Sequence, residues 1–227
     1  LVCSLLLLYL ITVGNAIAFS TVSQLGFILA APEVGGFYAL THGLVKSSLF
    51  LIAGTLPNRN LQELKNQPMN TAIWIPLVMA SFSISGFPLL SGFGAKVLTM
   101  KNLLSWQVIA MNIAALGTAT TFAKFIFLPH NKSGKSKAKK GFIPAVCLLL
   151  VGLLIANGVY YQAYTFNNII KPLITIFLGW LTYVLILQSK VIKLPRAAEK
   201  FEHLIGVMSL MLILLFWLLI GNQASLS

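Results

Sequence analysis

Long apolar runs separated by short polar segments occupy most of this chain of 227 residues, and no other feature restricts its fold as strongly. Hydrophobic residues make up 58% of the sequence and charged residues only 9%. A soluble domain usually carries about 25% charged residues. A helix that crosses a bilayer needs about 20 mostly apolar residues, and runs close to this length recur. The sequence therefore predicts an all-α, polytopic transmembrane helical bundle with seven or eight spans.

In chain order, the expected spans cover residues 1–17, 19–31, 36–56, 71–104, 106–128, 142–164, 169–188 and 203–220. The run 71–104 is too long for one straight span, since as a helix it would measure roughly 50 Å. Gly86 and Pro88 interrupt this run, and Gly92 lies in a second interruption at residues 91–94. Proline removes a backbone donor and clashes with the preceding turn, so these residues predict a broken helix with hinges between Gly86 and Lys96.

Two ionisable residues lie near the middle of the run 36–56. His42 and Lys46 are four residues apart, so they share one face of a helix. Ionisable groups at membrane depth usually face a protein interior or a watery path and carry protons or ions. We therefore interpret His42 and Lys46 as functional, with Lys96 beside the break as a third candidate. The alternative is a histidine that a neighbouring helix satisfies and a lysine that reaches toward the interface.

Small polar residues near these candidates include Ser23, Gln24, Ser47 and Ser48. They are candidates for lining a water path, although close packing of helices is the simpler interpretation of each.

The formal net charge is +12, and two short segments, 130–141 and 189–202, hold most of the lysines and arginines. This clustering is typical of topology signals and of contact with the anionic lipid bilayer, and it argues against nucleic-acid binding. Two spans separate the basic loops, so we expect both on the cytoplasmic side. Three spans separate the loop 57–70 from the loop 130–141 if the break divides two helices, which predicts that these two loops lie on opposite sides.

The sequence gives no sign of a cofactor or a metal site. Cys3 and Cys147 both lie in apolar runs and are expected to be buried, while His130 and His203 stand at span edges without partners. We therefore expect no redox chemistry in this chain.

Three segments in the same order resemble motifs of one known family. Residues 18–26 read AFSTVSQLG, residues 41–51 read THGLVKSSLFL, and residues 85–96 read SGFPLLSGFGAK. They are similar to the "AYSTxSQxG", "HAxxKxxLFL" and "GxPPLSGFxxK" segments of the antiporter-like membrane subunits. Respiratory complex I, its photosynthetic relatives and the Mrp-type Na⁺/H⁺ antiporters share these subunits. The resemblance covers roughly residues 18–129.

The resemblance implies a proton-translocating module of two inverted five-helix repeats, of which this chain carries the second. His42 and Lys46 would then belong to a central polar axis, and Lys96 would pass protons toward the exit. The glutamate and lysine pair of the first repeat has no counterpart here. The acidic and basic cluster that usually precedes the first motif is replaced by residues 12–17, which read TVGNAI.

The resemblance also predicts the organisation and the setting of the chain. It divides the chain into the half-module 1–129, the Lys-rich loop 130–141 and the C-terminal helices 142–227. Because Leu1 opens in the middle of an apolar run, we expect a fragment or a split subunit with a first-repeat partner. Other expected partners are membrane subunits of an NADH or ferredoxin dehydrogenase or of an Mrp-type complex, in a bacterial inner membrane or a thylakoid membrane. One alternative to proton translocation is a structural or assembly role. Another is that the chain carries Na⁺ in place of protons.

Overall fold

The computed structural model describes residues 12–134, 140–158 and 161–187, together with positions 206, 209, 210, 213, 214 and 217. The chain divides into two compact units, Leu1–Ile192 and Lys193–Ser227, and the helices between Val13 and Thr182 belong to the first. Most of the expected span 203–220 and most of the expected span 1–17 lie outside the described residues, as does the second basic loop.

Helices form nearly all of the described secondary structure, which confirms the predicted all-α class. The helices are α2 (Val13–Ala30), α3 (Pro32–Ala53), α4 (Leu61–Leu64), α5 (Thr71–Ser85), α6 (Ser91–Lys101), α7 (Ser105–Ile126), α8 (Phe142–Gly158) and α9 (Phe166–Thr182). A short 3₁₀ turn (Tyr161–Ala163) precedes α9, and a π-helical turn (Tyr183–Leu187) follows it. Within the described part of the chain, four helices are long and apolar enough to cross a membrane: α2, α3, α7 and Phe166–Leu185. The helices α5 and α8 are apolar but shorter.

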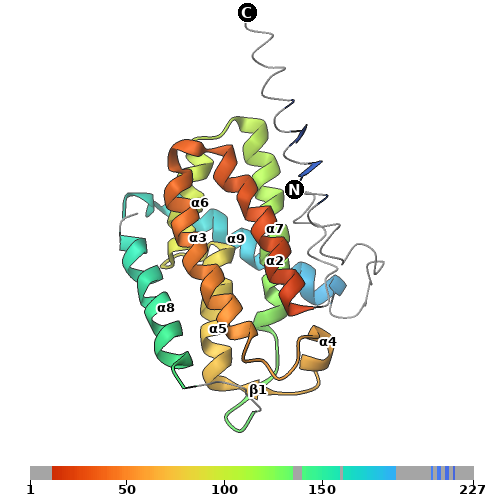
Figure 1. Ribbon diagram of the computed structural model, residues 1–227. Coiled ribbons are helices and arrows are strands. Elements are labelled where there is room, and N and C mark those ends of the chain that lie inside the picture. Colours follow the sequence, from red (N-terminus) through yellow and green to blue (C-terminus); the bar gives the residue numbers. More distant parts are fainter. Residues whose placement is uncertain are drawn as a thin grey trace, which may run out of the picture. The chain divides into compact units, whose positions relative to one another are not determined.

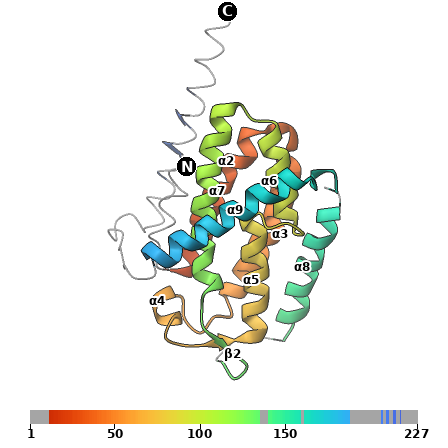
Figure 2. The same ribbon diagram turned by 180° about the vertical axis from the view of Figure 1, so that it is seen from behind.

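Helix α3 lies at the centre of the bundle, since it contacts α2, α5, α6 and α8 (Figure 1). Helix α7 packs against α5 on one side and against α9 on another, and α9 crosses it obliquely when the bundle is seen from behind (Figure 2). The largest fully buried side chains include Phe27, Leu49, Ile52, Phe93 and Phe122. These residues come from α2, α3, α6 and α7, and Phe27 and Phe93 belong to one buried apolar cluster.

The boundary predicted between residues 17 and 19 is wrong, because α2 runs without interruption through it. Hydroxyl groups of the next turn support the helix there: Ser20 Oγ donates to the carbonyl oxygen of Ile17 at 2.8 Å, and Thr21 Oγ1 donates to the same oxygen at 3.3 Å. Neither glycine nor proline stands at this point. The first resembling motif therefore continues a helix that begins at Val13.

The predicted start of the next helix at Gly36 is also wrong, because α3 begins at Pro32. Proline is favoured in the first turn of a helix, where its missing N–H costs no hydrogen bond. Glu33 lies in this first turn as well, where a negative charge interacts favourably with the helix dipole. Helices α2 and α3 are thus joined by a tight connection immediately before Pro32.

The predicted broken helix is confirmed, since α5 ends at Ser85 and α6 begins at Ser91. Gly86 has a φ of 88°, a left-handed conformation that side chains disfavour, and Pro88 lies in the break. Leu89 is also left-handed, at φ 77°, and its N–H donates to the Tyr164 hydroxyl at 3.0 Å.

The second interruption predicted at residues 91–94 is wrong, because they form the first turn of α6. Gly92 is required for close packing, since a Cβ atom there would lie 1.8 Å from the carbonyl oxygen of Ser83. The glycine allows the two halves of the broken helix to approach each other.

The loops 57–70 and 130–134 lie at the same end of the bundle, which corrects the predicted topology. The strand β1 (Met69–Asn70) pairs in parallel with β2 (His130–Asn131), and the ring of Trp74 stacks on His130 with centroids 3.8 Å apart. Figures 1 and 2 show these strands below the same ends of the helices. The physical reason is that α5 and α6 together cross the bundle only once. Two crossings therefore separate the loops, where three were expected.

The prediction that Cys147 is buried is wrong, since its side chain is exposed on α8. Several large apolar side chains of α8, among them Leu148 and Ile155, are exposed as well. The face of α8 that carries Cys147 thus points outward from the bundle, while Val146 and Leu150 on the same helix are buried. Cys3 lies outside the described residues.

Candidate functional site

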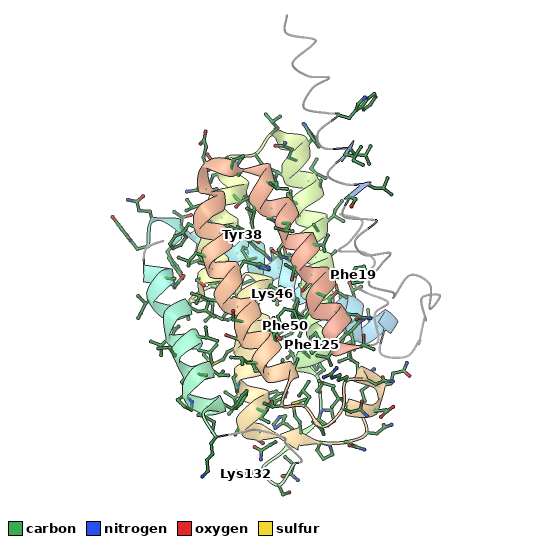
Figure 3. The ribbon with its side chains drawn as sticks, in the orientation of Figure 1. Phe19, Tyr38, Lys46, Phe50, Phe125 and Lys132 are labelled. Atoms are coloured by element: carbon green, nitrogen blue, oxygen red, sulfur yellow. The ribbon has the colours of Figure 1, made fainter. Side chains whose placement is uncertain are left out.

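Lys46 lies inside the bundle, on the face of α3 that meets α2. Its side chain is 5% exposed, and its Nζ atom donates to the carbonyl oxygen of Ile17 at 2.6 Å and to Ser20 Oγ. The ring of Phe122 lies 5.9 Å from Nζ, so an aromatic face also meets the amine. Figure 3 shows this interior position, in contrast to Lys132 on the loop beyond the helix ends. The partners of Lys46 among the described residues are therefore neutral oxygens.

Tyr38, His42 and Lys46 follow one another at intervals of four residues, so they share one face of α3. His42 is 9% exposed, and within the described part of the chain its Nε2 atom has no hydrogen-bond partner. The Tyr38 ring lies 6.5 Å from the His42 ring, centroid to centroid. The predicted face is thus buried, and its histidine keeps one ring nitrogen available for a further hydrogen bond.

A small cavity lies in front of His42. Its volume is about 10 Å³, and the residues that line it include Gln24, Tyr38, His42, Ser83 and Lys96. Ser83 Oγ is fully buried and, like His42 Nε2, has no hydrogen-bond partner among the described residues. A cavity of about this volume with several polar groups is just large enough for one water molecule. The geometry therefore places His42 and Lys96 on the walls of one polar space.

Lys96 reaches this cavity from the second half of the broken helix. It is 6% exposed, its Nζ atom donates to the carbonyl oxygen of Ile84 at 2.8 Å, and the Phe27 ring centroid lies 5.6 Å away. Ile84 belongs to the last turn of α5, where backbone carbonyls have no partner within the helix and the helix dipole favours a cation. The break in the helix thus creates the acceptor that holds Lys96.

A buried hydrogen-bonded chain connects three helices beside the cavity. The Tyr38 hydroxyl donates to Gln24 Oε1, Gln24 Nε2 donates to Thr118 Oγ1 at 3.2 Å, and Thr118 Oγ1 donates to the carbonyl oxygen of Ala114 at 2.9 Å. Gln24 and Thr118 are both fully buried. Because buried amide groups are costly without partners, this chain fixes α2, α3 and α7 in one arrangement.

Lys96 also borders a second and larger space. A groove of about 590 Å³ lies between the end of α5, α6, α7 and α9, and Ser85 and Lys96 form its inner wall. Lys96 is therefore common to the small cavity and to the groove, and it separates the interior of the bundle from the outer side of α6.

The four small polar candidates differ in their positions. Gln24 lines the cavity, Ser23 is buried, and Ser48 donates to the carbonyl oxygen of Leu44 at 2.9 Å. Ser47 is exposed on α3 and lines neither the cavity nor the groove. A serine next to Lys46 in sequence lies about 100° away around the helix, which explains the difference.

Four residues of the site were missed from the sequence: Ser20, Tyr38, Ser83 and Thr118. Tyr38 precedes His42 by four residues, so the same helical spacing that paired His42 with Lys46 also indicates Tyr38. Ser20 lies within the first motif, but its contact with Lys46 depends on how α2 packs against α3. No local pattern distinguishes Ser83 or Thr118 from the other hydroxyl residues of these helices.

An all-α bundle of apolar helices, with buried lysines and a histidine beside a broken helix, defines an integral membrane protein with an internal polar axis. Comparison with known families then makes the assignment specific. The family model described as "NADH:quinone oxidoreductase/Mrp antiporter, TM" matches residues 1–122, and the chain belongs to this family. The predicted resemblance to antiporter-like membrane subunits is thereby confirmed.

Individual relatives come from several organisms. The chain is 31% identical to NADH-ubiquinone oxidoreductase chain 5 of Acanthamoeba castellanii over 125 residues, which are 50% of this chain and 18% of that protein. It is 33% identical to NADH-quinone oxidoreductase subunit M of Rickettsia typhi over 118 residues, which are 46% of this chain and 24% of that protein. It is 28% identical to subunit N of Alkalilimnicola ehrlichii over 166 residues, which are 65% of this chain and 33% of that protein. The chain thus spans between 18% and 33% of the length of these curated relatives.

Proposed function

We propose that this chain translocates protons across a membrane as an antiporter-like subunit of a larger complex. In this mechanism, protons move stepwise along Lys46, His42 and Lys96, and each step is driven by a change of charge elsewhere in the complex. The observation that carries the proposal is the cavity that His42, Ser83 and Lys96 line, where His42 Nε2 and Ser83 Oγ have no hydrogen-bond partner among the described residues. One water molecule there would link the histidine to the lysine.

The surroundings of the two lysines support transfer of protons. Each amine donates to a backbone carbonyl, of Ile17 for Lys46 and of Ile84 for Lys96, and each faces an aromatic ring. A lysine held by neutral acceptors has no permanent counter-charge to keep it protonated, so it can lose and regain a proton. Sodium ions bind preferentially through several oxygen ligands, whereas the three proposed carriers present nitrogen atoms.

The family supports a role within a complex. The relatives named above are a chain and two subunits of NADH-ubiquinone or NADH-quinone oxidoreductases. We place the chain beside other membrane subunits, including one that supplies the first repeat, in a bacterial inner membrane or a thylakoid membrane. The end of the bundle that carries the loop 130–134 would face the cytoplasm or its equivalent, because it holds Lys132 and Lys140.

The decisive experiment replaces each lysine with methionine in the assembled complex. We expect Lys46→Met and Lys96→Met to abolish proton uptake into reconstituted vesicles, measured with a pH-sensitive dye, while the complex still assembles. Methionine fills a similar volume and cannot carry a proton, so the packing around each site is largely kept.

Lys132→Met is the matched control, because Lys132 is exposed on the loop (Figure 3). It should leave translocation unchanged. Normal pumping by both interior variants would overturn the proposal and favour a structural or assembly role. Equal loss in the control variant would show that the assay responds to net charge.

A further inference from the structure

The groove outside Lys96 has the size of a ligand-binding site. Its volume of about 590 Å³ lies in the usual range for such sites, roughly 300–1,000 Å³. Helix α9 forms one wall and is held against α7 by its buried residues Ile176 and Gly179. The opposite wall is α6, the short half of the broken helix. The groove is therefore bounded by elements of the packed bundle.

The polar part of the groove is cationic and lacks a counter-charge. Lys101 and Lys171 are exposed at the groove, Lys96 borders it from within, and none of the residues that line it is acidic. The neutral side chains Asn112, Asn168 and Thr175 add hydrogen-bonding groups. The whole chain has 16 Lys and Arg residues against four Asp and Glu residues. None of the described residues that line the groove supplies an anion to neutralise these amines.

The position of Lys101 fits the depth of a lipid headgroup. Helices α5 and α6 together cross the bundle once, and Lys101 is the last residue of α6. Trp106 follows in the first turn of α7 and is 66% exposed. Tryptophan is enriched at the interface between membrane and water, so this end of the bundle lies near the headgroups.

The rest of the groove is largely apolar. Val97, Met100, Val108 and Ile174 line it between the lysines. The neighbouring face of α9 exposes the large apolar side chains of Leu173, Phe177 and Leu181. A ligand that fits this surface has an anionic group at one end and a long apolar part.

From these observations we infer that the groove between α6, α7 and α9 binds one anionic phospholipid. Lys101 and Lys171 hold its phosphate, the amide and hydroxyl side chains complete the hydrogen bonds, and an acyl chain lies along α9. This site shares only Lys96 with the cavity of the proposed function, and lipid binding can be measured without any translocation.

The test measures lipid binding to the full chain, purified in detergent and stripped of lipid, by native mass spectrometry. The probes are phosphatidylglycerol, phosphatidylcholine with the same acyl chains, and inorganic phosphate. We expect the unchanged chain to bind one molecule of the added phosphatidylglycerol. The double variant Lys101→Gln, Lys171→Gln should bind it roughly thirtyfold more weakly, since each basic residue near a membrane surface contributes about fivefold.

Two further double variants make the result specific. Lys132→Gln with Lys140→Gln removes the same charge from exposed loop positions and should bind phosphatidylglycerol normally. Lys101→Arg with Lys171→Arg keeps the charge and should also bind normally. Equal weakening in the loop variant, equal binding of phosphatidylcholine, or no retained phospholipid would overturn the inference. Retention of inorganic phosphate in place of phospholipid would also overturn it, because the groove would then bind a free anion.

Discussion

The amine of Lys96 in α6 donates to the carbonyl oxygen of Ile84 in α5 at 2.8 Å, so this lysine ties together the two halves of the broken helix. The same side chain borders both the small cavity and the outer groove. Its position depends on the backbone between the halves, because Gly86 packs directly against it. The break thus both supplies an acceptor for the lysine and determines where the lysine lies.

Replacing Gly86 by alanine should disturb Lys96 specifically. A Cβ atom at Gly86 would lie 3.0 Å from Lys96 Cδ and 3.7 Å from its Nζ, and the φ of 88° disfavours any side chain. We expect Gly86→Ala to lower stability by about 1 kcal/mol through the backbone and to reduce translocation through the displaced lysine. Thermal unfolding of the purified chain and proton uptake by the complex measure the two effects.

Gly141→Ala separates these two causes. Gly141 has a similar φ of 93°, but a Cβ atom there would meet nothing within 4 Å. This variant should lose a similar amount of stability and pump normally. If both variants pump equally well, contact with Gly86 does not position Lys96 for its role.

Replacing Gly92 by alanine should separate the two halves of the broken helix. The added Cβ would lie 1.8 Å from the backbone oxygen of Ser83, and a backbone atom cannot rotate away as a side chain does. We expect destabilisation of about 1–3 kcal/mol, the usual cost of overpacking, seen as a lower midpoint of thermal unfolding in detergent. Gly36→Ala in α3 is the control, because its Cβ would meet nothing within 4 Å and alanine favours a helix. A Gly92→Ala chain as stable as the Gly36→Ala chain would contradict the close approach.

Removing the Tyr38 hydroxyl should weaken the packing of α2 against α3. In Tyr38→Phe, Gln24 Oε1 loses a buried donor, and an unsatisfied buried group costs about 1–3 kcal/mol. Chemical or thermal unfolding of the purified chain measures the loss. Tyr161→Phe is the matched control, since Tyr161 is 70% exposed and its hydroxyl accepts an exposed hydrogen bond from Gln162. Equal stability of the two variants would show that the buried chain through Gln24 contributes little.

The features of the site that the sequence predicts correctly are local ones. Gly86 and Pro88 identify the break because their backbone restrictions act within a few residues. The four-residue spacing of His42 and Lys46 identifies a shared face because helical periodicity is a property of one segment. Hydrophobic content alone also predicts the all-α class.

The features that the sequence does not predict depend on neighbours that are distant in the chain. Lys46 meets Ile17 and Ser20 only because α2 packs against α3, and Gln24 meets Thr118 across 94 positions of sequence. The topology error has the same origin, because a break does not reveal whether its two halves cross the bilayer once or twice. The pairing of Met69 with His130 decides between these possibilities, and no periodicity indicates it.

Replacing Ser83 by alanine should affect proton transfer without lowering stability. Its hydroxyl is fully buried, lines the cavity and has no hydrogen-bond partner among the described residues. Removing an unsatisfied polar group costs nothing in hydrogen bonds, so Ser83→Ala should be as stable as the unchanged chain or slightly more stable. A water molecule that links His42 to Lys96 would nevertheless lose one of its polar contacts, and proton uptake by the complex should fall.

Ser81→Ala is the matched control for this prediction. Ser81 lies on the same helix and is equally buried, but its hydroxyl donates to the carbonyl oxygen of Leu77 at 2.7 Å and it does not line the cavity. It should therefore lose a little stability and pump normally, which is the opposite pattern to Ser83→Ala. If Ser83→Ala lowers stability, its hydroxyl has a structural partner. If it leaves both stability and pumping unchanged, the cavity does not lie on the path of the proton.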